Sequence, residues 1–345
     1  MPQGDFTQST FILLDRPPDL DEVAAVLASF EILKKVEDPG TPWYFGGPSL
    51  VIPYRSEQNG FVYVDIVGHP WPDSMGHPTH DSDLFGAWAS GQFGPHVVPG
   101  ALVRASRMSL IWRPEADLLD DHTAFVRVRT SYVFGQEEGA DPIPADHDPV
   151  HELEFVMSIT KKLMDLPGSI CYFNPNGELL RDAEALNAQL GWCAANKVPS
   201  MPAWTSARLF EARVDRPDST QAEDRSEEAL EPDATDNWWL LDTVGLPQVD
   251  LPDLEAFFPA GVVDPGPLHD FLWDVAFHLI GEGHGFEDGD TLPGPADRRW
   301  RVRVMENSWF PPLRRILRWF PVDELVPEDF EKDLAPDHRF HPQPS

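Results

Sequence analysis

The sequence predicts an α/β protein of the α+β kind, with mixed sheets flanked by helices in two similar-sized subdomains. Short segments rich in branched and aromatic residues alternate with segments of helical periodicity. The 345 residues include 36 Pro and 24 Gly, a loop-rich composition that disfavours an all-helical bundle. Hydrophobic residues make up 41% of the chain, with 12 Trp and 21 Phe, which indicates a folded protein with an ample core.

The first subdomain is predicted to span residues 1–145, with a ferredoxin-like N-terminal part because its first elements follow a β-α-β-β order. Lys34 and Lys35 are expected to end the first helix, since cations suit the C-terminal end of the helix dipole. In the last strand, alternation places Phe125, Arg127 and Arg129 on one face. The predicted elements are strand 10–14, a helix that runs through residues 23–30 and ends near residues 34–35, strands 49–53 and 61–67, helix 83–89, and strands 101–112 and 124–134.

The second subdomain is predicted to span residues 146–322, with a boundary between residues 140 and 149. Residues 215–236 carry many acids and almost no apolar side chains, which predicts a mobile acidic loop, and residues 323–345 form an acidic tail. The predicted elements are helix 149–166, strand 169–173, turn 174–177, helix 186–195, strands 206–214 and 238–244, helix 268–280, strand 300–304, and a strand or short helix over 313–320.

The helix over 268–280 is the best-defined element of the second subdomain. Leu268, Phe271, Leu272 and Val275 follow the i, i+3, i+4, i+7 pattern of an amphipathic helix. The glycines at 281, 283 and 285 are expected to end it, because glycine accepts the left-handed conformation found at helix C-termini.

The charge balance is the strongest bulk signal. Fifty-eight acidic against 26 basic residues give a net charge of −32, which argues against direct binding to nucleic acid or an anionic membrane. Such a charge favours attraction to a basic partner, or serves solubility alone. The first residues do not resemble a signal peptide, and no apolar run approaches the roughly 18 residues of a membrane span. Cys171 and Cys193 are too few for a disulfide framework, so we expect a cytoplasmic protein.

The familiar enzymatic signatures are missing from the sequence, so we predict no catalytic residues, metal or cofactor. Three glycines over 281–285 resemble a nucleotide-binding loop but follow a helix, where that motif requires a strand. His151-Glu152 resembles the start of a zinc-binding helix, but Phe155 stands where the second histidine would be.

Two clusters of polar residues are compatible with either a metal or catalytic site or a purely structural role. The loop that contains His69, His77 and His80 either chelates a transition metal or forms a rigid surface loop between prolines. Asp288 and Asp290 suggest a calcium site or an acid/base pair, but an ordinary tight turn between elements is the favoured interpretation. The enzymatic alternative is a metal-dependent hydrolase that uses Asp288 and Asp290 with a histidine, either His278 or His284.

One face of helix 268–280 carries a polar stripe. Asp270, Asp274 and His278 stand at i, i+4 and i+8, and Glu282 continues the line. The stripe is either a solvated helix face or an acidic ridge that meets arginines and lysines of another protein. The acidic loop adds further candidate partner-binding residues, namely Glu223, Asp224, Glu227, Glu228 and Glu231.

Several stretches together resemble the bacterial domain-of-unknown-function family 4261. They are 166–180 (LPGSICYFNPNGELL), 242–256 (DTVGLPQVDLPDLEA) and 288–291 (DGDT), with shorter pieces at 70–75, 93–95 and 99–102. The resemblance spans about residues 10–321 and leaves the acidic loop and the tail outside. Its Pro, Gly and aromatic positions are read as fold-forming, because no motif among them is diagnostic of a reaction.

Some members of that family are similar to immunity proteins of the type VI secretion system. The resemblance therefore implies a cytoplasmic, non-enzymatic protein that binds and neutralises a cognate antibacterial toxin. The acidic charge fits a toxin with a basic surface, hence a nuclease. Carboxylates would cover the toxin's active site, or the protein would block an oligomer interface of the toxin. A homodimer and a scaffold protein without a toxin partner stay open as alternatives.

Overall fold

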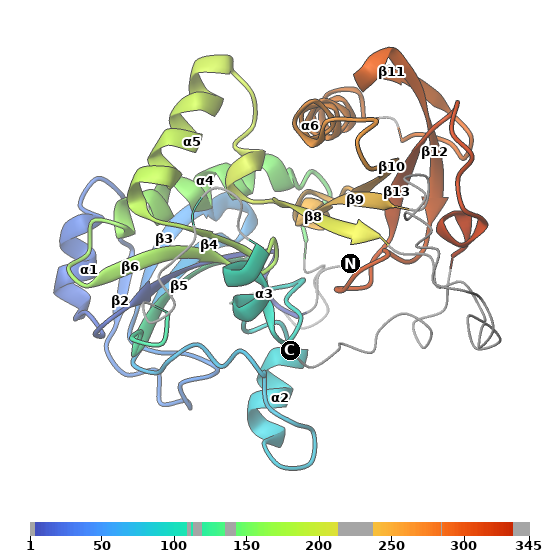
Figure 1. Ribbon diagram of the computed structural model, residues 1–345. Coiled ribbons are helices and arrows are strands. Elements are labelled where there is room, and N and C mark those ends of the chain that lie inside the picture. Colours follow the sequence, from blue (N-terminus) through green and yellow to red (C-terminus); the bar gives the residue numbers. More distant parts are fainter. Residues whose placement is uncertain are drawn as a thin grey trace. The chain divides into compact units, whose positions relative to one another are not determined.

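The computed structural model describes residues 4–108, 112, 119–134, 143–212, 237–283 and 285–333 (Figure 1). The chain divides into two compact units, each built on its own sheet. Unit 1 holds the described residues up to 206 together with 244–250, and unit 2 holds those of 207–243 and 251–333. The α+β class predicted from the sequence is confirmed, since both units combine a sheet with helices. The boundary predicted between residues 140 and 149 falls inside unit 1.

Unit 1 contains a seven-stranded sheet of order β2-β3-β4-β5-β1-β6-β7, in which all six neighbouring pairs are antiparallel. Strand β5 lies between β1 and β4, which are connected through α1. Strand β1 lies between β5 and β6, which are connected through α4. This interleaving is a ferredoxin-like arrangement extended at both edges. The sequence predicted it for the N-terminal part within residues 1–145, whereas its second helix and fourth strand, α4 and β6, lie beyond residue 145. The strands are β1 Gln8–Leu14, β2 Lys34–Val36, β3 Ser49–Arg55, β4 Gly60–Val67, β5 Ala124–Ser131, β6 Ser169–Asn174 and β7 Leu179–Arg181.

Both faces of this sheet are covered. Helix α4 packs against β1 and β5, and its Thr160 hydroxyl lies 2.6 Å from the hydroxyl of Thr10. The opposite face carries an aromatic core in which Trp71 packs edge-on against Phe11 and Phe173 beneath the segment that contains α2 and α3. The helices of unit 1 are α1 Leu20–Val26, α2 Ser82–Ala89, α3 Ala101–Met108, α4 Pro149–Leu163 and α5 Ala183–Asn196.

Two predictions for unit 1 are wrong. Residues 101–108 form helix α3 and not a strand, because the carboxylate of Asp73 accepts the N–H groups of Leu102 and Val103 at 2.7 and 3.2 Å and so satisfies the free helix N-terminus. The first helix ends at Val26, and the two lysines at 34 and 35 belong to edge strand β2. In both cases a distant segment supplies the hydrogen bonds that decide the local structure.

Unit 2 contains a six-stranded mixed sheet of order β11-β12-β13-β10-β9-β8, in which β10 and β13 are parallel. Helix α6 (Pro265–Glu282) contacts β10, and its Phe271 contacts Trp300 and Trp319. The helix ends at Gly283, which has a left-handed φ of 62°, as the glycine pattern predicts. The strands are β8 Ser206–Ala212, β9 Trp238–Val244, β10 Asp253–Pro259, β11 Thr291–Gly294, β12 Arg298–Met305 and β13 Ile316–Pro321.

A network of buried ion pairs crosses the sheet of unit 2. Glu255 lies opposite both Asp242 and Arg318 in the strand register and accepts a 2.7 Å hydrogen bond from Nε of Arg318. Among the described residues, three arginines and three acids take part in this network. They are Arg208, Arg314 and Arg318 with Asp242, Asp253 and Glu255.

Within the described ranges, none of the helices combines the length and the apolar character that a membrane span requires.

Candidate partner-binding site

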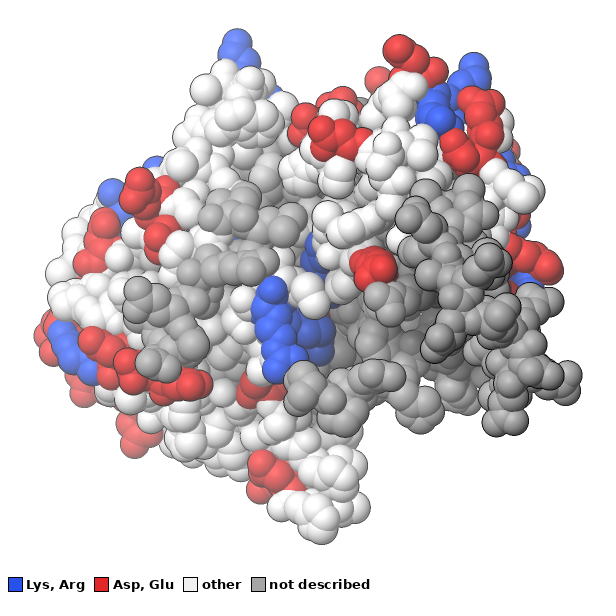
Figure 2. Space-filling model, in the orientation of Figure 1, with Lys and Arg blue, Asp and Glu red and all other residues white. Residues whose placement is uncertain are grey.

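The polar stripe predicted on helix α6 is exposed. Asp270, Asp274, His278 and Glu282 all lie on the solvent side of the helix, and the side chain of Asp270 is 83% exposed. The opposite side buries Leu268, Leu272 and other apolar residues. Figure 2 shows acidic side chains over α6. The structure therefore brings three of the predicted partner-binding acids onto one helix face, and their role in binding stays a prediction.

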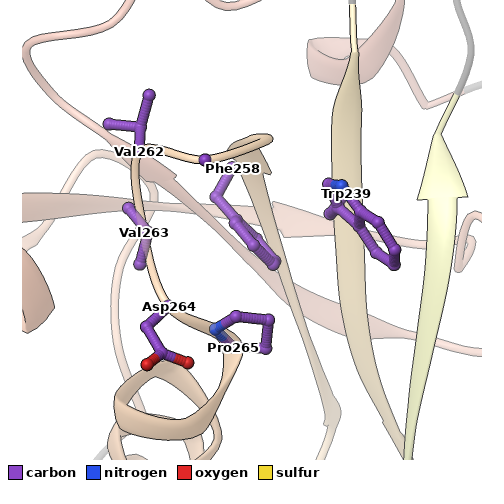
Figure 3. Close-up of a pocket in the computed structure, with 7 residues that line it drawn as sticks. Trp239, Phe258, Val262, Val263, Asp264 and Pro265 are labelled. Atoms are coloured by element: carbon purple, nitrogen blue, oxygen red, sulfur yellow. The ribbon is translucent and has the colours of Figure 1, made fainter.

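An aromatic groove adjoins the N-terminus of α6. Trp239 of β9 and Phe258 of β10 are direct partners in the strand register, and the connection from Gly261 to Pro265 completes the lining (Figure 3). The groove has a volume of about 520 Å³. Trp239 is half-buried and Val262 is 42% exposed, so apolar surface is accessible from solvent. Such a combination of depth and apolar lining suits the insertion of a side chain from another molecule.

Asp264 places a carboxylate beside this groove. It is the N-cap of α6, and its side chain accepts a 2.9 Å hydrogen bond from the backbone N–H of Gly266. The residue is exposed, so its second oxygen can meet a ligand. An aromatic ring and a carboxylate together suit an arginine or lysine side chain, whose stem packs on the ring while its cation pairs with the acid.

In the acidic turn after α6, the carboxylates accept hydrogen bonds that stabilise the turn. Asp288 accepts hydrogen bonds from Nε of Arg303 at 2.9 Å and from the backbone N–H of Val304 at 3.0 Å. Asp290 accepts the backbone N–H of Glu287 at 2.9 Å. These contacts fit the favoured interpretation of an ordinary turn between elements. His284, one candidate for the hydrolase alternative, lies outside the described residues.

The histidine-rich loop of unit 1 makes aromatic contacts. His69 stacks on Trp43 with ring centroids 4.4 Å apart, and His77 stacks on His80 at 5.0 Å. Nδ1 of His77 also lies 2.9 Å from the hydroxyl of Thr79. Within the described part of the chain, no group of three or more His, Cys, Asp or Glu side chains has the geometry of a metal site.

The remaining predicted partner-binding residues lie in the acidic loop. That loop is outside the described residues, so the structure places none of its five candidates, which are Glu223, Asp224, Glu227, Glu228 and Glu231.

Sequence reasoning missed the groove. The tandem pair Trp238-Trp239 carries the signal, because neighbouring strand residues point to opposite faces and one indole must leave the buried face. Trp238 is 3% exposed and packs in the core, whereas Trp239 lines the groove. The contribution of Phe258 required the pairing of β9 with β10, which the sequence did not show.

Residues 242–320 match the family model described as a domain of unknown function, DUF4261. The match supports the family part of the sequence resemblance for this portion of the chain. It contains the whole of α6, the acidic turn and the groove residues from Phe258 onward, whereas Trp239 lies just before it. No curated protein and no solved structure matches the chain.

Proposed function

We propose that this protein is a non-enzymatic immunity protein that binds and neutralises a cognate type VI secretion toxin, a nuclease with a basic surface. The observation that carries the proposal is the exposed acidic face of α6 beside the aromatic groove. The type VI assignment itself rests on the resemblance of residues 166–180, 242–256 and 288–291 to the DUF4261 family, some of whose members are similar to such immunity proteins.

The two parts of this surface supply different contributions to binding. The net charge of −32 attracts a basic protein over long range and raises the rate of encounter. Asp270 and Asp274 are four residues apart, or about 6 Å along the helix axis, and Glu282 follows eight residues after Asp274, or about 12 Å, so the three acids present a row of charges to one partner surface. The groove at Trp239 and Phe258 provides an apolar pocket for an anchoring side chain, and buried anchors of this kind contribute most of the binding free energy of an interface.

The decisive experiment is co-expression of the protein with the toxin encoded beside its gene, together with a binding measurement on the purified pair. The variant Asp270→Asn/Asp274→Asn/Glu282→Gln removes three charges and keeps side-chain size. We expect its affinity to fall about 10- to 100-fold, because each exposed pair contributes up to about 1 kcal/mol. Protection of the cells should weaken in parallel.

A matched variant controls for total charge. Glu31→Gln/Glu37→Gln/Asp323→Asn also removes three exposed acids, none of them on α6, and should leave affinity within about two-fold. Equal losses in the two triple variants would show that only net charge matters and would remove α6 from the proposal. A failure of the unchanged protein to bind or protect would overturn the immunity function.

The hydrolase that uses Asp288 and Asp290 is the competing proposal. Both carboxylates already serve the turn, so the geometry supports this alternative less well. Elemental analysis of the purified protein separates the two, since stoichiometric metal that is lost on Asp290→Ala would favour the hydrolase.

A further inference from the structure

Unit 1 contains a small cavity with an apolar side and a charged end. Its volume is about 200 Å³, and it is partly open to solvent. Phe6, Phe45, Tyr63 and Phe134 form the apolar side, and Asp65 and Arg129 lie at the charged end. Phe45 and Phe134 are more than 40% exposed, so the mouth of the cavity is aromatic.

The charges at the inner end of this cavity do not balance. Asp65 is buried and accepts a 2.7 Å hydrogen bond from Nε of Arg127 and a 2.9 Å hydrogen bond from Nη2 of Arg129. Both of its oxygens are therefore occupied by two arginines that are themselves at most 3% exposed. The other partners of Arg129 are neutral, namely the side-chain and backbone oxygens of Gln92 and the ring of Phe6, whose centroid lies 3.9 Å from the guanidinium carbon. Within the described part of the chain, one buried positive charge therefore remains without a counter-charge, an arrangement that is costly in a protein interior.

Unit 2 shows how this chain neutralises buried arginines elsewhere. There, among the described residues, three buried arginines meet three buried acids. Among the described residues, the network of unit 1 pairs two arginines with one acid, and it borders a cavity.

Two polar groups at this end have unused hydrogen-bonding capacity. Nε of Arg129 is buried and has no acceptor among the described residues. Burial, and then the nearby Arg127, lower the pKa of Arg129 to about 9. Burial also raises the pKa of Tyr63, so its half-buried hydroxyl is a neutral donor beside the guanidinium at physiological pH.

We propose that this cavity binds a small monocarboxylate with an aromatic or branched apolar body. The carboxylate supplies the single negative charge that Asp65, Arg127 and Arg129 lack, and the four aromatic side chains cover the apolar body. A doubly charged ion such as phosphate would bring one negative charge more than the site lacks. The protein, with a net charge of −32, also repels such an ion more strongly than it repels a monocarboxylate. The cavity lies in unit 1, whereas the α6 face belongs to unit 2.

Calorimetric titration of the full-length protein tests the ligand chemistry. Benzoate is expected to bind with one-to-one stoichiometry. Benzamide, which has nearly the same shape without the charge, should bind at least about 10-fold more weakly, because a charge-assisted hydrogen bond is lost. Inorganic phosphate and acetate should also bind more weakly than benzoate. Equal affinity for benzoate and benzamide, tighter binding of phosphate, or no saturation by 10 mM benzoate (about −2.7 kcal/mol or weaker) would each overturn the proposal.

Substitution at the mouth of the cavity tests its location without disturbing the buried charges. Thr41 is exposed and lines the cavity, so Thr41→Trp should obstruct entry and weaken benzoate binding at least about 10-fold. Thr79→Trp places the same side chain at another exposed threonine of unit 1 and should leave binding within about two-fold. Unchanged benzoate binding by Thr41→Trp would show that the ligand site lies elsewhere.

Discussion

At the scale of single residues, the feature that defines unit 2 is the burial of complete ion pairs within a sheet. Glu255 and Arg318 are both 0% exposed, and the guanidinium of Arg318 also lies over the rings of Phe257 and Trp309. A buried pair of this kind stabilises little in comparison with apolar residues, but breaking it leaves one charge stranded away from water. Removal of a single partner should therefore be far more damaging than removal of an exposed pair.

The variant Glu255→Gln keeps the shape of the side chain and removes its charge. We expect the free energy of unfolding to fall by about 3–5 kcal/mol, because Arg318 is left buried without a counter-charge. Urea denaturation at pH 7 measures the change. Glu306→Gln is the control, since its 3.9 Å pair with Arg315 is exposed and should contribute less than about 1 kcal/mol. A cost below 1 kcal/mol for Glu255→Gln would contradict this account of the network.

At the scale of elements, helices form where a side chain satisfies their first N–H groups. Asp148 caps α4, and its carboxylate accepts the backbone N–H of His151 at 3.0 Å. Such local caps can be read in the sequence, and α4 is predicted well. Helix α3 is different, because its N–H groups bond to Asp73, about 30 residues earlier in the chain. Local sequence patterns do not predict that contact, so the sequence predicts a strand for residues 101–108.

Replacement of the local cap of α4 tests its contribution. Asp148→Ala should lower the free energy of unfolding by about 1 kcal/mol, through loss of the hydrogen bond to His151 and of a negative charge at the positive end of the helix dipole. Asp165→Ala is a suitable comparison, because Asp165 is exposed just beyond the C-terminal end of the same helix. That change should leave stability equal or slightly raised, and a similar loss in both variants would argue against capping as the cause.

At the scale of the whole molecule, net charge is the property that bears most directly on the proposed partner. Exposed charges act over about a Debye length, which is roughly 10 Å at 0.1 M salt and a few ångströms near 0.5 M. We expect the association rate with a basic toxin to fall at least about 10-fold between 0.05 and 0.5 M salt. Stopped-flow mixing measures it directly. A rate that does not change with salt would exclude inhibition by charge complementarity and would leave blockage of a toxin oligomer interface.

The sequence by itself determined the α+β class, the ferredoxin-like start and the best-defined helix, because periodicity and caps are local properties. The sequence also predicted the stripe of Asp270, Asp274 and Glu282, because helical spacing alone places these residues on one face. The boundary predicted between residues 140 and 149 does not coincide with the division of the chain into units, because unit 2 begins only at residue 207. Composition gives no signal of that division.

Only the tertiary structure decided which polar residues share a site. Arg127 and Arg129 were expected on one strand face, but their single shared acid and the adjoining cavity depend on the pairing of β5 with β4. In the same way, Trp239 meets Phe258 only because β9 pairs with β10 in one register. Alternation along a strand fixes the side of the sheet on which a residue lies, whereas the register between strands decides its neighbour, and that register is a property of the folded chain.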